Sequence, residues 1–412
     1  MRKRTNSTYG WLSIIIAIAS AVGIYFLPEY KFWFLAVLLL NVLYAFAFGK
    51  RYGNGALITC RLLVGALFIF SSFTKGVDPL GTKYKILDYL SVYHMEWLNS
   101  LAMVLAVGLI LAEFIVGICL FTKVLPRLAV LGATLLMLFF TCTTLFDALY
   151  DLVPDCGCFG TAVKMTNWQT FYKNLVIDAV LIPLILNNKQ LTNRLGVPVQ
   201  FIIAIAFALG FLGFEIYNYR HLPVVDFMNW KVGKQMTVQT PEASHIYLTY
   251  RNKATGETQE YLSPNYPWND SVWMSQWEFV KQRVEGGADF LGFTALDEDG
   301  NDVTEMLLNT ENLLMFTSHD LTKVTDEEWA KVKAITEAAD QHGYYVIWIV
   351  ANEPEYVQQL RDKYDFIYEA YYADELEIKT IVRFNPGLIW LDNGLVKDKW
   401  SAIDFTDALK IF

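Results

Sequence analysis

The chain has 412 residues, 54% of them hydrophobic, and this apolar content is too high for a single soluble domain of that size. Up to Tyr217 it carries 16 Lys and Arg against 10 Asp and Glu, and beyond that residue it carries 17 against 32. A basic apolar half followed by an acidic polar half predicts a membrane domain joined to a water-soluble one. No basic stripe marks a nucleic-acid partner.

Seven stretches approach the ~20 apolar residues needed to cross the hydrocarbon core of a lipid bilayer. These expected spans are Trp11–Leu27, Phe32–Gly49, Ala56–Lys75, Leu98–Phe121, Leu128–Tyr150, Trp168–Leu186 and Val197–Tyr217. Basic residues precede the first span and occupy every second connection, and the positive-inside rule assigns these segments to the cytoplasm. They are Arg2, Lys3, Arg4, Lys50, Arg51, Lys123, Arg127, Lys189 and Arg194. We therefore expect a multi-pass protein of the bacterial inner membrane, with a cytoplasmic N-terminus and an extracytoplasmic C-terminal domain.

Ionisable residues within the spans are expected to face the bundle interior, because a charge exposed to lipid is costly. Counted from the helix ends, Arg61 lies about 7 Å and Glu113 about 13 Å from the cytoplasmic face, which predicts an ion pair between them. Such a pair could fix the helix register, or it could line a polar pocket for a quinone head group or a proton path. Asp147 and Lys173 are expected near the outer face.

The long connection between the third and fourth spans, residues 76–99, has apolar residues near helical spacing with charges between them. This pattern predicts an amphipathic helix lying at the membrane interface. The helix could be a lid or a docking ledge, or it could only anchor the connection.

Cys156 and Cys158 lie one residue apart in the string Asp155-Cys156-Gly157-Cys158-Phe159-Gly160, directly after the fifth span. Two neighbouring thiols suit disulfide exchange, because the mixed disulfide formed by one thiol is resolved by the second. The alternatives are a structural pair and a metal site, and the soluble half has no cysteine to complete four ligands. Cys142 could relay electrons to this pair or could be a packing residue. A cation such as Lys173 near the thiols would favour the thiolate, whereas the acids Asp151 and Asp155 would oppose it, and the sequence leaves this balance open.

The string Arg61-Leu62-Leu63-Val64-Gly65, the string Phe70-Ser71-Ser72-Phe73-Thr74-Lys75 and Glu113 in the next span together resemble the DoxX-type four-helix membrane family. The Cys-Gly-Cys-Phe-Gly element and the helix after it resemble the methylamine utilisation protein MauE branch. This resemblance covers about Leu57 to Leu186 and implies a role in thiol-disulfide chemistry outside the membrane. It does not imply methylamine metabolism.

The soluble half alternates predicted strands and helices. Buried strands are expected at Leu313–Phe316 and Tyr345–Val350, helices at Glu327–Gln341 and Pro354–Lys363, and a hairpin turn at Asp392-Asn393-Gly394. This order resembles a thioredoxin-like domain of the redoxin kind, with Pro386 at its cis-proline position. Ser318-His319-Asp320-Leu321 stands where such a domain would carry two cysteines. His319 could be an acid-base group or an exposed loop histidine, and the edge near Pro386 could bind an extended peptide.

The sequence thus predicts an α-helical integral membrane bundle of about seven transmembrane helices with a C-terminal α/β thioredoxin-like soluble domain. The expected divisions are two spans in 1–50, the four-helix domain in 56–187, a seventh span in 197–217, an aromatic-rich, strand-bearing connector in 218–286 and the soluble domain in 287–412. The favoured function is thiol-disulfide redox chemistry on an exported thiol- or disulfide-containing protein. The rival functions are an envelope scaffold and a small-solute transporter using an Arg61 and Glu113 pocket. The direction of electron flow is left open, a quinone in the bundle is a natural electron exchanger although no motif demonstrates it, and no metal is expected.

Overall fold

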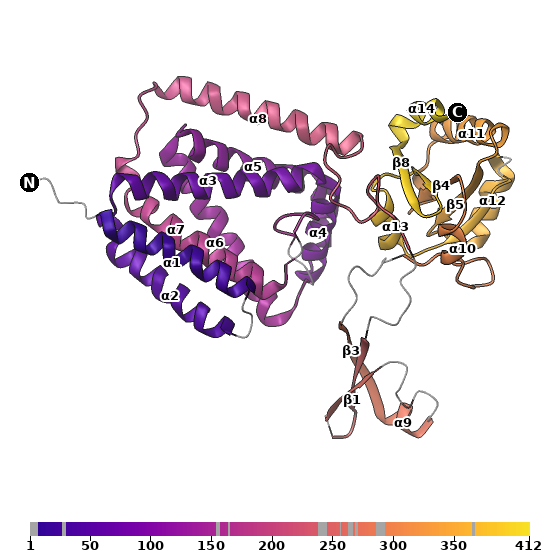
Figure 1. Cartoon of the computed structure of the whole chain (residues 1–412), viewed down its shortest axis with the longest axis horizontal. Helices are drawn as coiled ribbons and strands as arrows, with labels where there is room; N and C mark the ends of the chain where they lie inside the picture. Colours follow the sequence, from indigo (N-terminus) through magenta and orange to yellow (C-terminus); the bar gives the residue numbers. More distant parts are fainter. Residues whose placement is uncertain are drawn as a thin grey trace, which may run out of the picture. The chain divides into compact units, whose positions relative to one another are not determined.

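The computed structural model describes residues 7–26, 30–153, 157–163, 165–237, 245–255, 257–262, 267, 271–285, 293–364 and 367–412. They form two compact units, Met1–Met228 and Asn229–Phe412 (Figure 1). The first unit is helical, and the second contains two β-sheets with helices.

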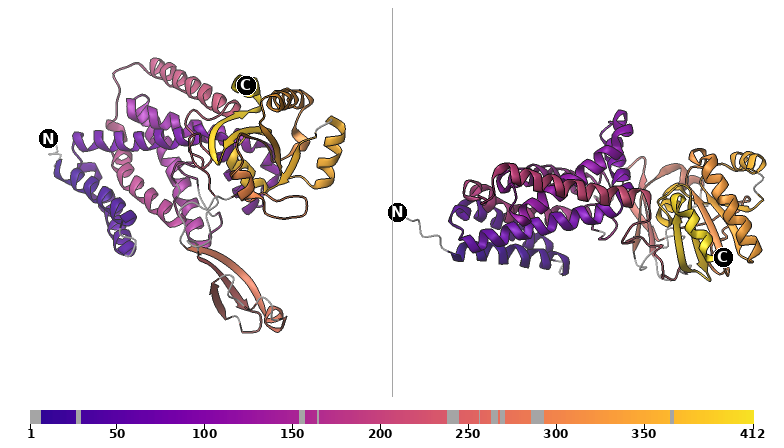
Figure 2. Two further views of the ribbon diagram at one scale, coloured as in Figure 1. Left: turned by 45° about the vertical axis from the view of Figure 1, so that its right-hand side comes forward. Right: turned by 90° about the horizontal axis from the view of Figure 1, so that it is seen from above.

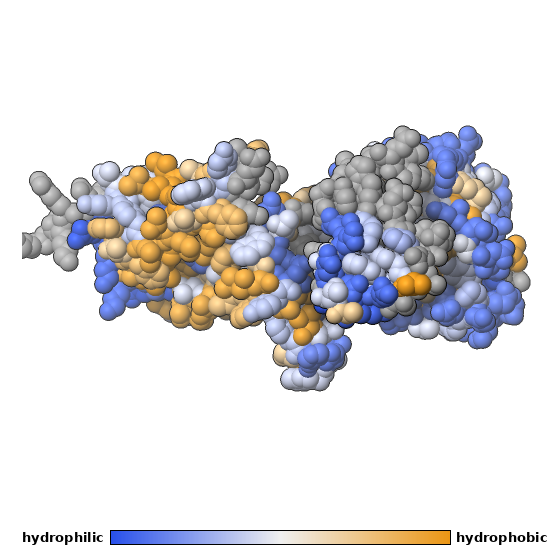
Figure 3. All heavy atoms as spheres, turned by 90° about the horizontal axis from the view of Figure 1, so that it is seen from below, coloured by the Kyte–Doolittle hydropathy of each residue, from blue (hydrophilic) through white to orange (hydrophobic). Residues whose placement is uncertain are grey.

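Six helices of the first unit are long and apolar enough to cross a membrane. They are α2 (Lys31–Phe48), α3 (Asn54–Val77), α5 (Ala102–Thr122), α6 (Pro126–Tyr150), α7 (Asn167–Leu186) and α8 (Val197–Arg220). Figure 3 shows hydrophobic residues covering much of the surface of this unit. Side chains of this kind are stable at a helix surface when lipid surrounds them, so the protein is a multi-pass membrane protein.

The first expected span forms α1 (Ser7–Phe26), whose apolar part, Thr8–Ile24, is shorter than the six helices above. Hydrogen bonds join α1 to α2, since Ser13 Oγ donates to Asn41 Oδ1 at 2.8 Å and Asn41 Nδ2 donates to Ser13 O at 3.0 Å. The crossing of the membrane by α1 stays a prediction.

Two glycines set the register of α3 against α5. A Cβ atom at Gly65 would lie 2.9 Å from Phe121 N, and one at Gly117 would lie 2.8 Å from Ile69 N. The two backbones can approach this closely only because both residues are glycine and have no side chain, as at small-residue contacts between membrane helices. Their contact places Arg61 beside the end of α5 and Glu113 beside the last two turns of α3.

The basic connections of the bundle meet at one end. Asn187 Nδ2 donates to Gly49 O at 2.9 Å, Arg127 Nη2 donates to Lys189 O at 3.0 Å, and Asn193 Nδ2 donates to Lys123 O at 2.6 Å. Because α3 runs away from this end, its last residue, Val77, lies at the other.

The connection after α3 is helical, as predicted, and forms α4 (Pro79–Val92). The side chain of Asp78 caps it by accepting from Gly81 N, and Pro79 occupies the first turn, where its missing N–H costs nothing. Figures 1 and 2 show α4 lying crosswise at the end of α3 and α5. Most of its residues are partly exposed, which agrees with a position at the membrane interface.

A five-stranded sheet in the order β6-β5-β4-β7-β8 forms the centre of the second unit. Its strands are β4 (Leu313–Ser318), β5 (Tyr345–Val350), β6 (Glu369–Tyr372), β7 (Gly387–Asp392) and β8 (Leu395–Ser401). The first three are mutually parallel, and β7 and β8 are antiparallel to their neighbours. The helices are α10 (Thr304–Leu308), α11 (Asp326–Gln341), α12 (Pro354–Tyr364), α13 (Glu375–Ile381) and α14 (Phe405–Ala408).

Local sequence signals explain these elements. Thr325 and Glu328 form the reciprocal capping box that starts α11, and Trp329 on its buried face stacks on Trp348 of β5 at 5.1 Å. Asn393 and Gly394 both have positive φ, as the turn between β7 and β8 requires. The strands expected at Leu313–Phe316 and Tyr345–Val350 and the helices expected at Glu327–Gln341 and Pro354–Lys363 are therefore confirmed.

The connector carries strands, as expected. β1 (His245–Asn252), β2 (Thr258–Leu262) and β3 (Trp277–Glu285) form an antiparallel sheet with α9 (Ser271–Gln276) beside it. Before this sheet, Trp230 is fully buried against Phe293, and Met236 N donates to Gly394 O at 2.8 Å. Residues 230–236 of the connector are thus packed on the larger sheet.

Candidate functional site

The loop that carries the cysteine pair follows α6. Asp151, at the end of that helix, has a positive φ, and the side chain of Asn167 donates to both Asp151 Oδ1 and Val153 O at 2.9 Å. Cys156 lies outside the described residues, and Cys158 is partly buried. We name the described segment 157–163 the thiol loop. It contains Cys158 and begins one residue after Cys156.

The backbone conformation of the thiol loop explains why glycine occupies positions 157 and 160. Gly157 and Gly160 have φ values of 62° and 54°, in the left-handed region that other residues rarely adopt. Gly160 N donates to Gly157 O at 2.9 Å and closes a turn. A Cβ atom at Gly160 would lie 3.0 Å from Thr74 O, so the loop contacts the backbone of α3 directly.

Phe159 packs its ring among helices of the bundle. The ring lies 5.3 Å from that of Phe70 on α3, and Lys173 Nζ of α7 lies 4.7 Å from its centre. The cation expected near the thiols is Lys173, which lies over Phe159, the residue directly after Cys158. Its effect on either thiol stays a prediction.

A partly buried serine, in contact with a buried ion pair, holds the backbone of Cys158. Ser71 Oγ lies 2.9 Å from Cys158 O and 2.8 Å from Glu113 Oε2, and Glu113 Oε1 lies 2.5 Å from Lys75 Nζ. The side chains of Glu113 and Lys75 are only 1% and 8% exposed. We call Ser71, Lys75 and Glu113 the polar seat. The thiol loop contacts Ser71, and Ser71 in turn contacts the Lys75 and Glu113 ion pair.

The expected ion pair between Arg61 and Glu113 is wrong. Glu113 pairs with Lys75, whereas Arg61 Nη1 donates to the carbonyl oxygens of Leu120 and Phe121 at the end of α5. The prediction measured depth from the ends of the spans, but the glycine contact between α3 and α5 sets the register. Arg61 and Glu113 thus have separate partners, and a polar pocket near them stays a prediction.

Asp147 and Lys173 have different partners. The buried Asp147 accepts a hydrogen bond from Tyr89 Oη of α4 at 2.6 Å, while Lys173 lies over the ring of Phe159. The first contact joins the crosswise helix to α6.

Among the other described cysteines, Cys60 and Cys119 are buried in the apolar core, in agreement with a packing role. Cys142 is exposed on α6. A relay through Cys142 stays a prediction, with its side chain on the outside of the helical unit.

Sequence reasoning missed Ser71, Lys75, Tyr89 and Glu215. Lys75 stood at the end of a predicted span and was not counted among the charges inside it. Glu215 of α8 is 1% exposed, and its Cγ would lie 3.6 Å from a Cβ atom at Gly76. A carboxylate within the last apolar span was the signal for it.

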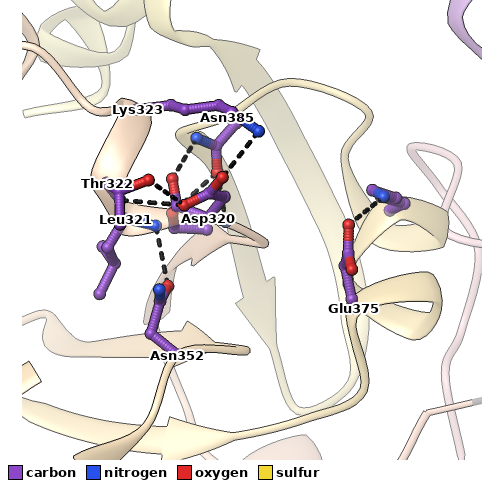
Figure 4. Close-up of polar contacts among 9 residues, drawn as sticks. Asp320, Leu321, Thr322, Lys323, Asn352, Glu375 and Asn385 are labelled. Carbon is purple, nitrogen blue, oxygen red and sulfur yellow. Dashed lines mark hydrogen bonds and ion pairs between the residues drawn. The ribbon is translucent and has the colours of Figure 1, made fainter. Parts of the chain in front are cut away.

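In the second unit, Asn385 connects the segment Ser318–Leu321 to the start of β7 (Figure 4). Its Oδ1 accepts from Ser318 Oγ at 2.8 Å, and its Nδ2 donates to Asp320 O at 2.7 Å. Leu321 N donates to Asn352 Oδ1 at 2.8 Å, and the peptide bond before Pro386 is cis, as expected.

His319 is partly buried within this segment, and its Nδ1 is a buried atom without a hydrogen-bond partner in the described part of the chain. Burial, followed by the nearby Lys379 ammonium, lowers the pKa of His319 to about 4. The side chain is therefore neutral at pH 7 and is not a freely exposed loop histidine. In the described residues, no cluster of His, Cys, Asp or Glu could hold a metal ion.

The fold and the site define a membrane protein that crosses the bilayer several times and holds a cysteine-bearing loop on charged groups at one end of its bundle. Residues 53–187 match the family model of the methylamine utilisation protein MauE. The matched part includes the thiol loop and the polar seat, whereas α8 and the second unit lie outside it. No curated protein and no solved structure matches the chain.

Proposed function

We propose that the protein is a membrane thiol-disulfide redox protein that acts on exported proteins through Cys156 and Cys158. The observation that carries this proposal is the polar seat, which holds the backbone of Cys158 through Ser71. Burying the Lys75 and Glu113 charges in a membrane bundle is costly, and such groups commonly serve function. The match to the MauE family over residues 53–187 supports the same proposal.

The proposed reaction balances as a thiol-disulfide exchange. A thiolate of the exported protein attacks the Cys156–Cys158 disulfide and forms a mixed disulfide, and the second substrate thiol then displaces the cysteine. The substrate gains a disulfide, and the pair becomes two thiols, having accepted two electrons and two protons. A quinone would restore the disulfide by accepting both electrons and protons to become a quinol. A reducing protein would run the exchange in reverse.

The charge pattern supports an orientation. The basic connections 49–51, 123–127 and 187–194 meet at one end of the bundle, which we assign to the cytoplasm by the positive-inside rule. The thiol loop contacts the opposite end of α3 and is accordingly extracytoplasmic. Disulfides persist on that side of a bacterial inner membrane.

We also propose that the C-terminal domain is a cysteine-free thioredoxin-like module that positions the partner. The element order β4-α11-β5 followed by β7-β8-α14 supports this fold. The segment Ser318–Leu321 has no sulfur, so the domain itself cannot exchange disulfides. Its role would be to bind an extended peptide along the edge near Pro386.

Serine replacements test the function. With both Cys156 and Cys158 changed to Ser, exported thiol proteins of the native host should lose their normal redox states, because no resolving pair remains. With only one replaced, the other should trap the partner as a mixed disulfide, which mass spectrometry of non-reduced membranes identifies. The matched control is Cys119→Ser, a buried cysteine at the opposite end of the bundle, which should leave redox states unchanged.

Unchanged redox states in the double variant would refute the redox function and favour an envelope scaffold. One observation already favours a binding role for part of the chain: Asn385 and Asn352 fix the sulfur-free segment at Ser318–Leu321. The transporter alternative assumed an Arg61 and Glu113 pocket, and those residues have separate partners.

A further inference from the structure

Lysine side chains from two helices contact the residues on either side of Cys158. The Cγ atom of Lys85, on α4, lies 3.3 Å from the position of a Cβ atom at Gly157. The Nζ atom of Lys173, on α7, lies 4.7 Å from the centre of the Phe159 ring. Cys158 is thus placed between two points at which a cationic side chain contacts the thiol loop.

The position of Lys85 follows from the way α4 is fastened. Tyr89, one turn further along α4, donates through Oη to the buried Asp147 of α6 at 2.6 Å. The aliphatic stem of Lys85 then occupies the space that a side chain at position 157 would need. Glycine at this position therefore allows Lys85 to lie against the thiol loop.

The other charged groups around the thiol loop have partners of their own. They are Glu113 with Lys75, Asp147 with Tyr89, and Asp151 with Asn167. Asp88 Oδ2 lies 3.7 Å from Lys85 Nζ, but the Asp88 side chain is 52% exposed, so water screens this contact. Lys173 has no ion-pair partner among the described residues, which exclude Asp155. Within the described part of the bundle, the incompletely compensated charges beside Cys158 are therefore positive.

We propose that Lys85 and Lys173 stabilise the thiolate of Cys158 and so make Cys158 the leaving sulfur of the cysteine pair. A nearby ammonium group favours a thiolate, and the sulfur that forms the more stable thiolate leaves faster in disulfide exchange. The inference rests on the proposed function and adds a separate role for each sulfur.

The exchange then has a defined order. A thiolate of the exported protein attacks the sulfur of Cys156, the disulfide bond breaks, and Cys158 leaves with the electron pair as a thiolate. The new bond joins the exported protein to Cys156. The second thiolate of the exported protein attacks its own sulfur in this bond, and Cys156 leaves with the electron pair. The two freed thiolates take up the two protons that the substrate thiols released.

Alkylation of Cys158 at different pH values tests the effect of the lysines without a partner. The full chain carrying Cys142→Ser and Cys156→Ser, in non-ionic detergent, is treated with iodoacetamide from about pH 5 to about pH 10, because the thiolate is the reacting form. Mass spectrometry of the Cys158 peptide gives the pH at which the rate is half its maximum. Lys85→Met and Lys173→Met retain an unbranched side chain without charge. Each should raise this pH and lower the rate at about pH 7 by about two- to fivefold, the effect of one ammonium near a protein surface.

Two further variants on α4 separate the charge of Lys85 from its packing. Lys85→Arg retains a cation and should retain the rate of the parent, which assigns the effect of Lys85→Met to charge. Lys83→Met removes a different cation of the same helix, whose Nζ lies 5.9 Å from the centre of the Tyr84 ring, and should leave the rate unchanged. Thermal unfolding verifies that each variant is folded, and the three α4 variants suffice if Lys173→Met does not fold.

An unchanged half-maximal pH in Lys85→Met or in a folded Lys173→Met would overturn the inference, as would an equal shift in Lys83→Met. Trapping of the partner tests the roles of the two sulfurs. Cys158→Ser should trap more partner than Cys156→Ser, because the bond to the partner is formed by Cys156, and equal or reversed yields would overturn this assignment.

Failure of the proposed function is a separate result, because alkylation requires no partner. Exported proteins that keep their redox states in the cysteine double variant would refute the redox function. A shift in Lys85→Met would still show in that case that the lysine charge acts on Cys158.

Discussion

The two units differ in how a buried polar side chain is paired. In the helical unit, Glu113 is paired with Lys75 and accepts a hydrogen bond from Ser71, so its burial is compensated by two polar atoms on α3. In the second unit, His319 has a buried Nδ1 without a described partner. Such a group is stable in the fold only in its neutral form, which makes it sensitive to acid.

His319 should weaken the second unit between about pH 6.5 and about pH 4. Burial lowers its pKa in the fold from 6.5 to about 4, so the unfolded chain binds a proton first as the pH falls through this window. Stability is therefore complete above the unfolded pKa and is lost on acidification. The full loss would be of the order of 2 kcal/mol, allowing for partial solvent screening.

The measurement is chemical unfolding of the full chain in detergent, followed by the amide hydrogen exchange of β4 and β5, with His319→Gln as the comparison. Both proteins contain the same carboxylates. The difference between their losses of stability therefore removes the contribution of carboxylate titration. Equal losses of stability from pH 6.5 to pH 4 in both proteins would show that His319 does not control the acid response.

At the scale of elements, one helix contact places the whole site. Gly65 and Gly117 bring α3 and α5 together, and their register puts Ser71 and Lys75 beside Glu113. The thiol loop then lies on the last turns of α3 because Gly160 permits contact with Thr74 O. Small residues on two elements thus determine where a charged pair and a cysteine loop meet.

Gly117→Ala should destabilise the bundle by about 1–3 kcal/mol, the usual cost of forcing an extra carbon into a packed interior. Its Cβ would lie 2.8 Å from Ile69 N and 3.0 Å from Gly65 O, which are backbone atoms that cannot move aside. Gly108→Ala on the same helix is the matched control, since no atom lies within 4 Å of its Cβ position. Thermal unfolding in one detergent compares the two variants, and equal midpoints would contradict the proposed register.

Much of this arrangement could be predicted from local sequence, and the rest depended on tertiary contacts. Helices, strands and the turn at Asn393-Gly394 follow from periodicity and turn chemistry, and they were found where they were expected. The partner of Glu113 could not be found in this way, because depth counted from span ends does not determine the register of two packed helices, which the Gly65 and Gly117 contact determines here. A lysine at the end of a span, such as Lys75, resembles an ordinary boundary residue until the neighbouring helix is placed.

For the whole molecule, the chain order determines which regions share a side of the membrane. The thiol loop is followed by α7, the basic connection at 187–194 and α8. If both helices cross, the second unit begins on the same side as the thiol loop. The expected extracytoplasmic location of both therefore depends on these two crossings and on the direction set by the basic residues.

Cysteine scanning in a cysteine-free background tests this topology. Ser91→Cys at the end of α4 and Lys323→Cys in the second unit should react with a membrane-impermeant maleimide in intact spheroplasts, since both positions are exposed and assigned outside. Lys189→Cys, in a basic connection, should react only after the cells are lysed if the orientation assigned by the positive-inside rule holds. Labelling of Lys189→Cys before lysis, with protection of Ser91→Cys, would invert the orientation. The thiol loop would then face the reducing cytoplasm, where a stable exported disulfide could not be formed.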